Sequence, residues 1–117
     1  MLFHILFFSA TTTLCACQQL LIPARNGSSV ISFSEPKVIT GNFDGYNHEF
    51  DRGRPCNTDA DTPDENAVFI LEDGATLSNV IIGPNQLEGI HCLGSCTLKN
   101  TWFRDVCEGE FLLAVDF

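Results

Sequence analysis

Basic residues are scarce in this sequence. Lys and Arg together number 6 against 15 Asp and Glu, which gives a formal net charge of -9 at pH 7. Because nucleic acid binding requires a basic face that neutralises phosphates, this balance argues against a nucleic acid partner. An acidic polysaccharide would also be repelled unless a cation lay between it and the protein.

Long apolar runs are absent as well. The run at residues 2–8 is far shorter than the ~20 residues that a membrane-spanning helix needs, so we expect no membrane partner. Small residues follow it, and Leu14-Cys15-Ala16 offers a cleavage site. We therefore interpret residues 1–17 as a secretory signal and expect an extracellular protein. No Lys or Arg precedes the run, and a buried N-terminal strand is the alternative interpretation.

Helical spacing is missing too, and one sequence unit instead occurs twice. Residues 75–83 and 96–104 share Thr-Leu-x-Asn at an offset of 21, so that Ile81 corresponds to Trp102. The same offset relates Ile90 to Phe111, and a slip of one residue relates Val68 to Ile90. A period of this length with short apolar segments predicts a solenoid of strands, with one rung per repeat. An antiparallel meander with a chance echo is the alternative.

The repeat also makes predictions for individual side chains. Asn79 and Asn100 should stack in adjacent rungs, about 4.8 Å apart, and hydrogen bond along the stack. Because Trp102 corresponds to Ile81, we expect Trp102 to pack in the core rather than to stack on a sugar.

The rest of the chain divides into a lead-in at residues 18–36 and a solenoid at 37–117. The lead-in contains Asn26-Gly27-Ser28, a glycosylation acceptor if the protein is secreted. Strands are expected at 37–40, 67–71, 89–92 and 111–115, with a turn at 42–45 and a long surface loop at 46–65. For the acidic cluster in that loop a solvated surface is favoured over calcium binding, since it lacks the Gly and terminal Glu of a dedicated calcium loop. Its members are Asp59, Asp61, Asp64 and Glu65.

Two of the six cysteines, Cys15 and Cys17, fall in the signal. The other four form an even set that suits disulfides in an oxidising compartment, with three possible pairings left open. We expect Cys56 to staple the long loop to a group of three neighbours, and zinc is a weaker alternative because only two of the four have a close spacing. The three are Cys92, Cys96 and Cys107.

The sequence AVFILEDGATLSNVIIG at residues 67–83, with EGIHC at 88–92 and CTL at 96–98, resembles the small secreted pectate lyases of polysaccharide lyase family 3. The similarity extends from about residue 37 to residue 108. It implies an all-β fold, a right-handed parallel β-helix, of which about four rungs would be present. It further implies a secreted, monomeric lyase that cleaves de-esterified pectin (polygalacturonate) by calcium-dependent β-elimination.

The resemblance also assigns a metal site. Carboxylates of the family's calcium site correspond here to Glu88, Asp105 and Glu108. Arg104 and Gly109 stand where the family has acids, so one ligand is lost and Arg104 is expected to pair with a remaining carboxylate.

No catalytic residue is expected in this chain, because the family's Lys and Arg bases belong to later rungs. Lys99 and Arg104 match neither base, and a structural hydrogen bond is favoured over catalysis for His91. We therefore expect a truncated lyase of impaired activity. The alternatives are a non-catalytic pectin-binding module and a disulfide-stapled structural fragment.

Overall fold

The computed structural model describes residues 21–57 and 64–107. The expected signal at residues 1–17 and the expected strand at 111–115 lie outside these ranges. No helix in the described part is long and apolar enough to cross a membrane. The elements are β1 (Ile31–Ser32), β2 (Lys37–Ile39), β3 (Asn42–Asp51), the 3-10 helix η1 (Asp64–Asn66), β4 (Ala67–Leu71), β5 (Ala75–Ile82), β6 (Glu88–Cys92) and β7 (Cys96–Phe103).

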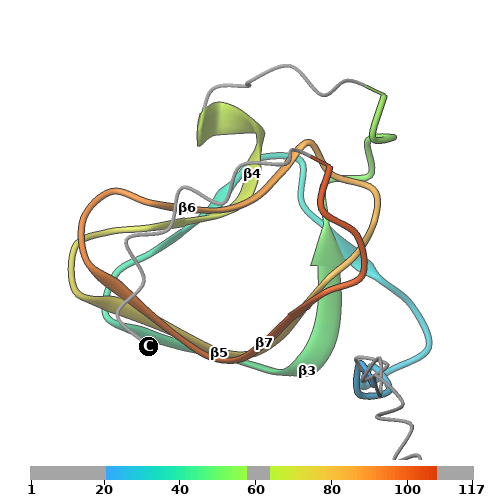
Figure 1. Ribbon diagram of the computed structural model, residues 1–117, viewed down its shortest axis with the longest axis horizontal. Helices are drawn as coiled ribbons and strands as arrows, with labels where there is room; N and C mark the ends of the chain where they lie inside the picture. Colours follow the sequence, from blue (N-terminus) through green and yellow to red (C-terminus); the bar gives the residue numbers. More distant parts are fainter. Residues whose placement is uncertain (1–20, 58–63, 108–117) are drawn as a thin grey trace, which may run out of the picture.

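The strands wind into a coil with two parallel sheets. One sheet has the order β1, β3, β5, β7, and the other has the order β2, β4, β6. Seen along the coil, β4 and β6 overlie each other on one wall and β5 and β7 on another (Figure 1). The described residues thus contain three rungs, β2–β3, β4–β5 and β6–β7, preceded by β1. This confirms the predicted parallel β-helix and excludes the antiparallel meander. Since β1 pairs with β3, the first sheet begins within the expected lead-in.

The register follows the sequence repeat. β7 lies beside β5 at the predicted offset, with Thr76 opposite Thr97 and Ile81 opposite Trp102. β6 lies beside β4 at the same offset, with Phe69 opposite Ile90. The predicted slip that placed Val68 opposite Ile90 is therefore wrong. Val68 and Phe69 are both fully buried, so apolar character alone could not distinguish them.

Each rung bends once within the larger sheet, at residues in the left-handed conformation. The backbone φ is 55° at Asn79 and 46° at Asn100, a region that Asn tolerates better than most residues. The bend in β3 is longer. Asp44 pairs with Ser78, but the next pair joins His48 to Val80, so residues 45–47 stand opposite Asn79 alone.

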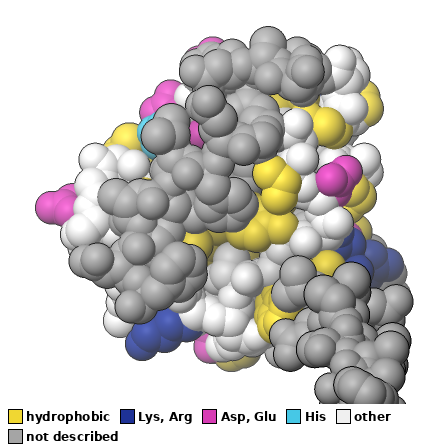
Figure 2. All heavy atoms as spheres, in the orientation of Figure 1, with side chains coloured by type: hydrophobic (Ala, Val, Ile, Leu, Met, Phe, Trp, Pro, Cys, Tyr) yellow, Lys and Arg dark blue, Asp and Glu magenta, His cyan; other side chains and the backbone are white. Residues whose placement is uncertain are grey.

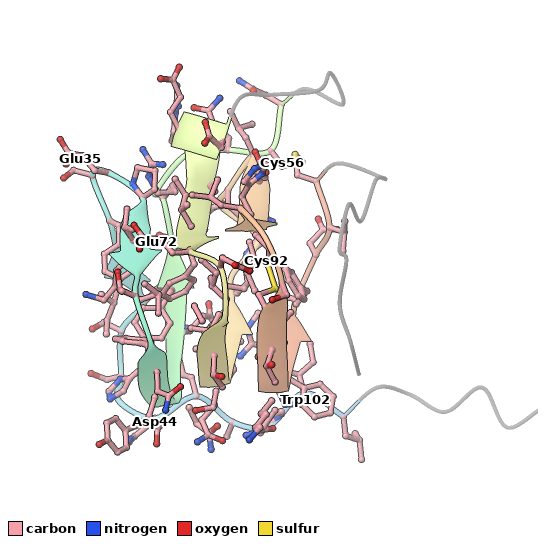
Figure 3. The ribbon with its side chains drawn as sticks, turned by 90° about the vertical axis from the view of Figure 1, so that its left-hand side faces the viewer. Glu35, Asp44, Cys56, Glu72, Cys92 and Trp102 are labelled. Atoms are coloured by element: carbon pink, nitrogen blue, oxygen red, sulfur yellow. A yellow bond between two sulfur atoms is a disulfide. The ribbon has the colours of Figure 1, made fainter. Side chains whose placement is uncertain are left out.

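A ladder of side-chain amides follows these bends, as predicted. Asn100 Nδ2 donates to Asn79 Oδ1 at 2.7 Å, and Asn79 Nδ2 donates to Asp44 Oδ1 at 3.0 Å. That hydrogen bond from Asn79, followed by one from the Tyr46 backbone N–H, lowers the pKa of the Asp44 carboxyl group. At the other end, Trp102 Nε1 donates to Asn100 Oδ1 at 2.6 Å. Asp44 and Trp102 accordingly lie along one edge of the coil, at its two ends (Figure 3).

The core fills the inside of the coil. Phe50 packs against Phe69 with ring centroids 5.2 Å apart, and Phe33 and Phe43 complete an aromatic group at the first rung. Burial of each large apolar side chain contributes about 1.5–3 kcal/mol. The buried core residues are Ile39, Phe50, Val68, Phe69, Leu71, Ala75, Leu77, Val80, Ile82 and Cys96.

Burial decreases toward the third rung. Most residues of β4 and β5 are buried, whereas β6 is partly exposed along its whole length. A rung of a solenoid buries its side chains between two neighbouring rungs. Among the described residues, the third rung has a neighbouring rung on one side only. Hydrophobic side chains are visible at this end of the coil (Figure 2).

The predicted turn at residues 42–45 and the start of the predicted loop at 46–65 are wrong. Both belong to β3, in which Glu49, Phe50 and Asp51 are buried. The stretch is rich in polar residues, but its carboxylates can be buried because they have partners inside the fold. Asp51 Oδ1 accepts hydrogen bonds from the Ser32 hydroxyl and, at 2.9 Å, from the Gly53 backbone N–H.

Two disulfides join the cysteines of the described part. Cys56 is bonded to Cys107, and Cys92 is bonded to Cys96. The first confirms that Cys56 staples the loop after β3 to the chain beyond β7. Because all four thiols are consumed, the zinc alternative is excluded.

Candidate functional site

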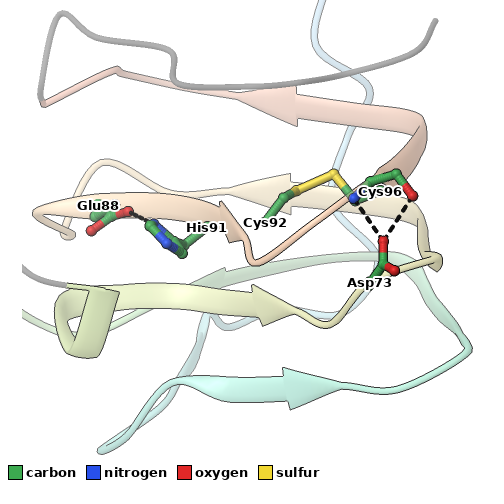
Figure 4. Close-up of a disulfide and its surroundings, with 6 residues drawn as sticks. Asp73, Glu88, His91, Cys92 and Cys96 are labelled. Carbon is green, nitrogen blue, oxygen red and sulfur yellow. Dashed lines mark hydrogen bonds and ion pairs between the residues drawn. A yellow bond between two sulfur atoms is a disulfide. The ribbon is translucent and has the colours of Figure 1, made fainter.

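Glu88 and His91 form a hydrogen-bonded pair on β6. His91 Nδ1 lies 2.7 Å from Glu88 Oε1, and the two side chains are 39% and 17% exposed respectively. Glu88 begins β6, and His91 lies further along the strand, next to Cys92 of the Cys92–Cys96 disulfide (Figure 4). His91 thus makes the structural hydrogen bond expected of it, and the bond holds the Glu88 carboxylate in one orientation.

The loop before β6 brings the region of Glu88 to that of Asp105. Gln86 is 1% exposed, and its Nε2 donates to the Asp105 backbone carbonyl at 3.1 Å. Its Oε1 is buried and has no hydrogen-bond partner among the described residues. Sequence reasoning missed Gln86. The sequence feature that could have indicated its burial was its position just before a strand, beside Leu87, which is also buried.

The described residues do not by themselves complete a calcium site. Calcium takes six to eight oxygen ligands, and no group of three or more His, Cys, Asp or Glu in residues 21–57 and 64–107 is placed to hold a metal. Of the three expected ligands, Glu88 is partly buried, Asp105 is exposed, and Glu108 lies outside the described residues.

Arg104 does not pair with the expected metal ligands. Its Nε donates to Glu49 Oε1, and Arg25 Nη1 lies 3.6 Å from Glu49 Oε2 on the other side. Glu49 belongs to β3, so this pair reaches across the second rung. Gly83 makes the reach possible, because a Cβ there would lie 3.0 Å from Glu49 Oε2. The expectation that Arg104 neutralises the metal site therefore fails for the described ligands.

Trp102 is not a core residue, so that prediction is also wrong. Val80 and Ile82 both belong to the inner core cluster, so Ile81 between them points to the opposite face, where it is nevertheless fully buried. Trp102 lies beside Ile81 and takes the same outward direction, whereas Phe103 packs against the core. Trp102 is partly exposed on the outer side of the sheet.

A second acidic region borders the other sheet. A shallow groove of about 500 Å³ is lined by Val38 and Ile70 together with Glu35, Asp64 and Glu65. Arg52 forms part of its wall, where Nη1 donates to the Glu65 and Ala67 carbonyls at 2.9 Å each. Asp64 and Glu65 are exposed, in line with the solvated surface expected of the acidic cluster, and Asp59 and Asp61 lie outside the described residues.

A further carboxylate closes the turn between β6 and β7. Asp73 Oδ1 accepts hydrogen bonds from the Ser95 hydroxyl and backbone N–H, each at 2.9 Å (Figure 4). The hydroxyl bond first, and then the backbone bond, lower the pKa of the Asp73 carboxyl group. This acid is occupied in holding two rungs together and is no candidate for binding.

Comparison with known proteins gives a consistent result. Residues 19–114 match the sequence profile of the family described as pectate lyase. The chain is 54% identical over 92 residues to pectate lyase E of Emericella nidulans, and 52% identical over 92 residues to probable pectate lyase E of Neosartorya fischeri. It is 47% identical over 94 residues to probable pectate lyase D of Emericella nidulans.

These alignments cover most of this chain but a minor part of each relative. Each spans 79% of the chain and 35% of the relative. The chain therefore represents about a third of the length of the curated relatives it matches. No solved structure matches it.

Proposed function

The chain belongs to the pectate lyase family, and we propose that it derives from an extracellular enzyme that cleaves de-esterified pectin (polygalacturonate) by calcium-dependent β-elimination. The observation that carries this proposal is the match over residues 19–114, together with 54% identity to a protein named pectate lyase E. The two disulfides support an oxidising, extracellular location.

Charge supports a requirement for a cation. A protein of net charge -9 repels a polymer of uronate groups, and calcium between the two would reverse that repulsion. When bound, calcium would stabilise the negative charge that develops as a proton is removed beside the uronate carboxylate.

We propose Glu88, Asp105 and Glu108 as calcium ligands in the complete enzyme. Gln86 supports this grouping, because its hydrogen bond to the Asp105 carbonyl joins the loop just before Glu88 to the segment that carries Asp105. His91 would orient Glu88 through their mutual hydrogen bond. Further oxygens must come from elsewhere, since the described part contains no group of three such ligands.

The described residues offer no evident base for the proton transfer. Lys99 is exposed, and Arg104 is held by Glu49. A general base contributes roughly 10²–10⁴-fold to a rate. We therefore expect the 117-residue polypeptide, expressed by itself, to show little or no turnover while retaining part of the calcium site.

The test separates binding from turnover. The polypeptide is titrated with calcium by calorimetry, and the unsaturated uronate product is measured on polygalacturonate with calcium and with a chelator. Glu88→Gln tests the ligand. Glu72→Gln is the matched control, because Glu72 is an exposed acid of the same wall, hydrogen bonded to Thr40.

We expect calcium binding that Glu88→Gln weakens and Glu72→Gln leaves unchanged, with product formation near background. Calcium binding equal in both variants would reject Glu88 as a ligand. Robust turnover indifferent to calcium would reject the proposed chemistry. Retention on polygalacturonate without turnover would favour the pectin-binding module instead.

A further inference from the structure

The N-terminal end of the coil has an open strand edge. β3 pairs with β5 along most of its length on one side, but on the other side β1 covers only Phe50 and Asp51. Residues 42–49 of β3 thus have no strand partner on that side among the described residues. Such an edge invites pairing with another chain, and solenoids require protection at their ends.

A segment before β1 lies against this edge. The Asn26 backbone N–H donates to the Asn47 carbonyl at 2.7 Å, and Asn26 Nδ2 donates to the Tyr46 carbonyl at 3.3 Å. Arg25 anchors the same segment through its ion pair with Glu49. Asn26 is thereby fixed at the point where β3 bends, and it remains exposed there.

Asn26 also begins the sequence Asn26-Gly27-Ser28, the single Asn-x-Ser/Thr triplet in the 117 residues. Gly27 has a φ of 78°, and both Gly27 and Ser28 are exposed. The triplet therefore lies in a surface bend, the setting in which such a triplet is expected to carry sugar. A position buried in a strand would have argued against modification.

We propose that Asn26 is an N-glycosylation site whose glycan covers the open edge of β3. In the transfer, Asn26 Nδ2 bonds to C1 of the first sugar of a lipid diphosphate-linked oligosaccharide. The bond from C1 to the diphosphate breaks, the lipid diphosphate leaves with its electron pair, and Nδ2 loses one proton. The other proton on Nδ2 remains and can still be donated to the Tyr46 carbonyl. The glycan thus extends from the edge without displacing the segment.

This inference rests on secretion, which belongs to the proposed function, and the experiment separates the two. The full chain is expressed in a yeast host in two forms, one with its own N-terminus and one preceded by a host secretion leader. Intact mass is measured before and after treatment with an N-glycan amidase, which converts a glycosylated Asn26 to Asp.

Two variants at one position provide the matched control. Ser28→Ala destroys the triplet but keeps Asn26 and its hydrogen bonds, whereas Ser28→Thr preserves the triplet. In the form with the host leader, we expect a glycan mass on the wild type and on Ser28→Thr, and its loss in Ser28→Ala. An unmodified Asn26 in that form would overturn the proposal. Failure of the chain's own N-terminus to direct export would count against secretion alone.

The protective role has its own readout. Aggregation of the purified secreted proteins is followed by light scattering at equal concentration. The scattering should rise several-fold faster for Ser28→Ala than for Ser28→Thr. Equal rates, with the glycan present on Ser28→Thr, would show that the glycan does not protect the edge.

Discussion

Removing Arg104 and removing Glu49 from their ion pair should have very different effects on stability, because the two side chains differ sharply in exposure. The Glu49 side chain is 3% exposed, whereas those of Arg104 and Arg25 are each 35% exposed. Removing Arg104 leaves a buried carboxylate with one more distant arginine at 3.6 Å. Removing the Glu49 charge instead leaves two arginines that can turn toward water.

The magnitudes follow from this difference in exposure. Breaking a fully buried pair costs about 3–5 kcal/mol, so with a partly exposed arginine we expect Arg104→Met to lower the free energy of unfolding by about 2–3 kcal/mol. Glu49→Gln keeps shape and hydrogen-bonding capacity, and should cost about 1 kcal/mol. In the double variant the orphaned charge is gone, so its cost should be less than the sum of the two single costs.

Urea unfolding of the four proteins measures these costs and the coupling between them. Arg54→Met is the control, since Arg54 is exposed and its guanidinium donates to Asn66 Oδ1, and it should cost at most about 0.5 kcal/mol. A cost for Arg104→Met no larger than for Arg54→Met would refute the argument from burial. So would a Glu49→Gln variant less stable than Arg104→Met.

Three further predictions concern the ladder, the turns and the disulfides. Asn79→Ala should be about 1 kcal/mol less stable than Asn79→Gly, because both lose the amide but only Ala is strained at a φ of 55°; equal thermal stabilities would contradict this. The pKa of Asp73 is lowered in the folded state, so its stabilising effect is complete above pH 3.8 and is lost as the pH falls through the lower folded-state pKa. On acidification, the melting temperature of Asp73→Asn should therefore fall less than that of the wild type. An acid profile of the variant equal to that of the wild type would contradict this role. An unreduced digest should yield the peptide that joins Cys56 to Cys107, and Cys56→Ser with Cys107→Ser should cost about 2–5 kcal/mol; four free thiols by mass spectrometry would disprove the pairing.

The sequence predicted the fold where rung length is constant and failed where it changes. The second and third rungs are related by an offset of 21, with Thr76 opposite Thr97, so the repeat was visible in the residues themselves. Between the first and second rungs, Lys37 pairs with Phe69, 32 residues later. The loop after β3 and the longer bend within β3 account for this change in rung length. No fixed period survives such insertions, and β3 was consequently assigned to a turn and a loop.

The candidate site was harder to predict because its geometry depends on side chains from different rungs. Glu88 and His91 lie three residues apart, but nothing in that spacing showed that they would bond to each other. Arg104 and Glu49 are separated by 55 residues and meet over Gly83. A resemblance transferred position by position could nominate Glu88 as a ligand, but it could not show which carboxylate would hold Arg104.

The error at Trp102 has a single physical source in the bend at Asn79. Strict alternation from the buried Leu77 would place Ile81 inside the coil, and Trp102 with it. A left-handed residue at Asn79 resets the alternation, so that Val80 and Ile82 enter the inner core and Ile81, although fully buried, turns to the outer face. The repeated Asn was correctly interpreted as a stack, yet the conformation that makes it stack also exchanges the inner and outer faces of the strand beyond it. A repeated Asn within an apolar strand of a solenoid therefore predicts both a ladder and a change of face.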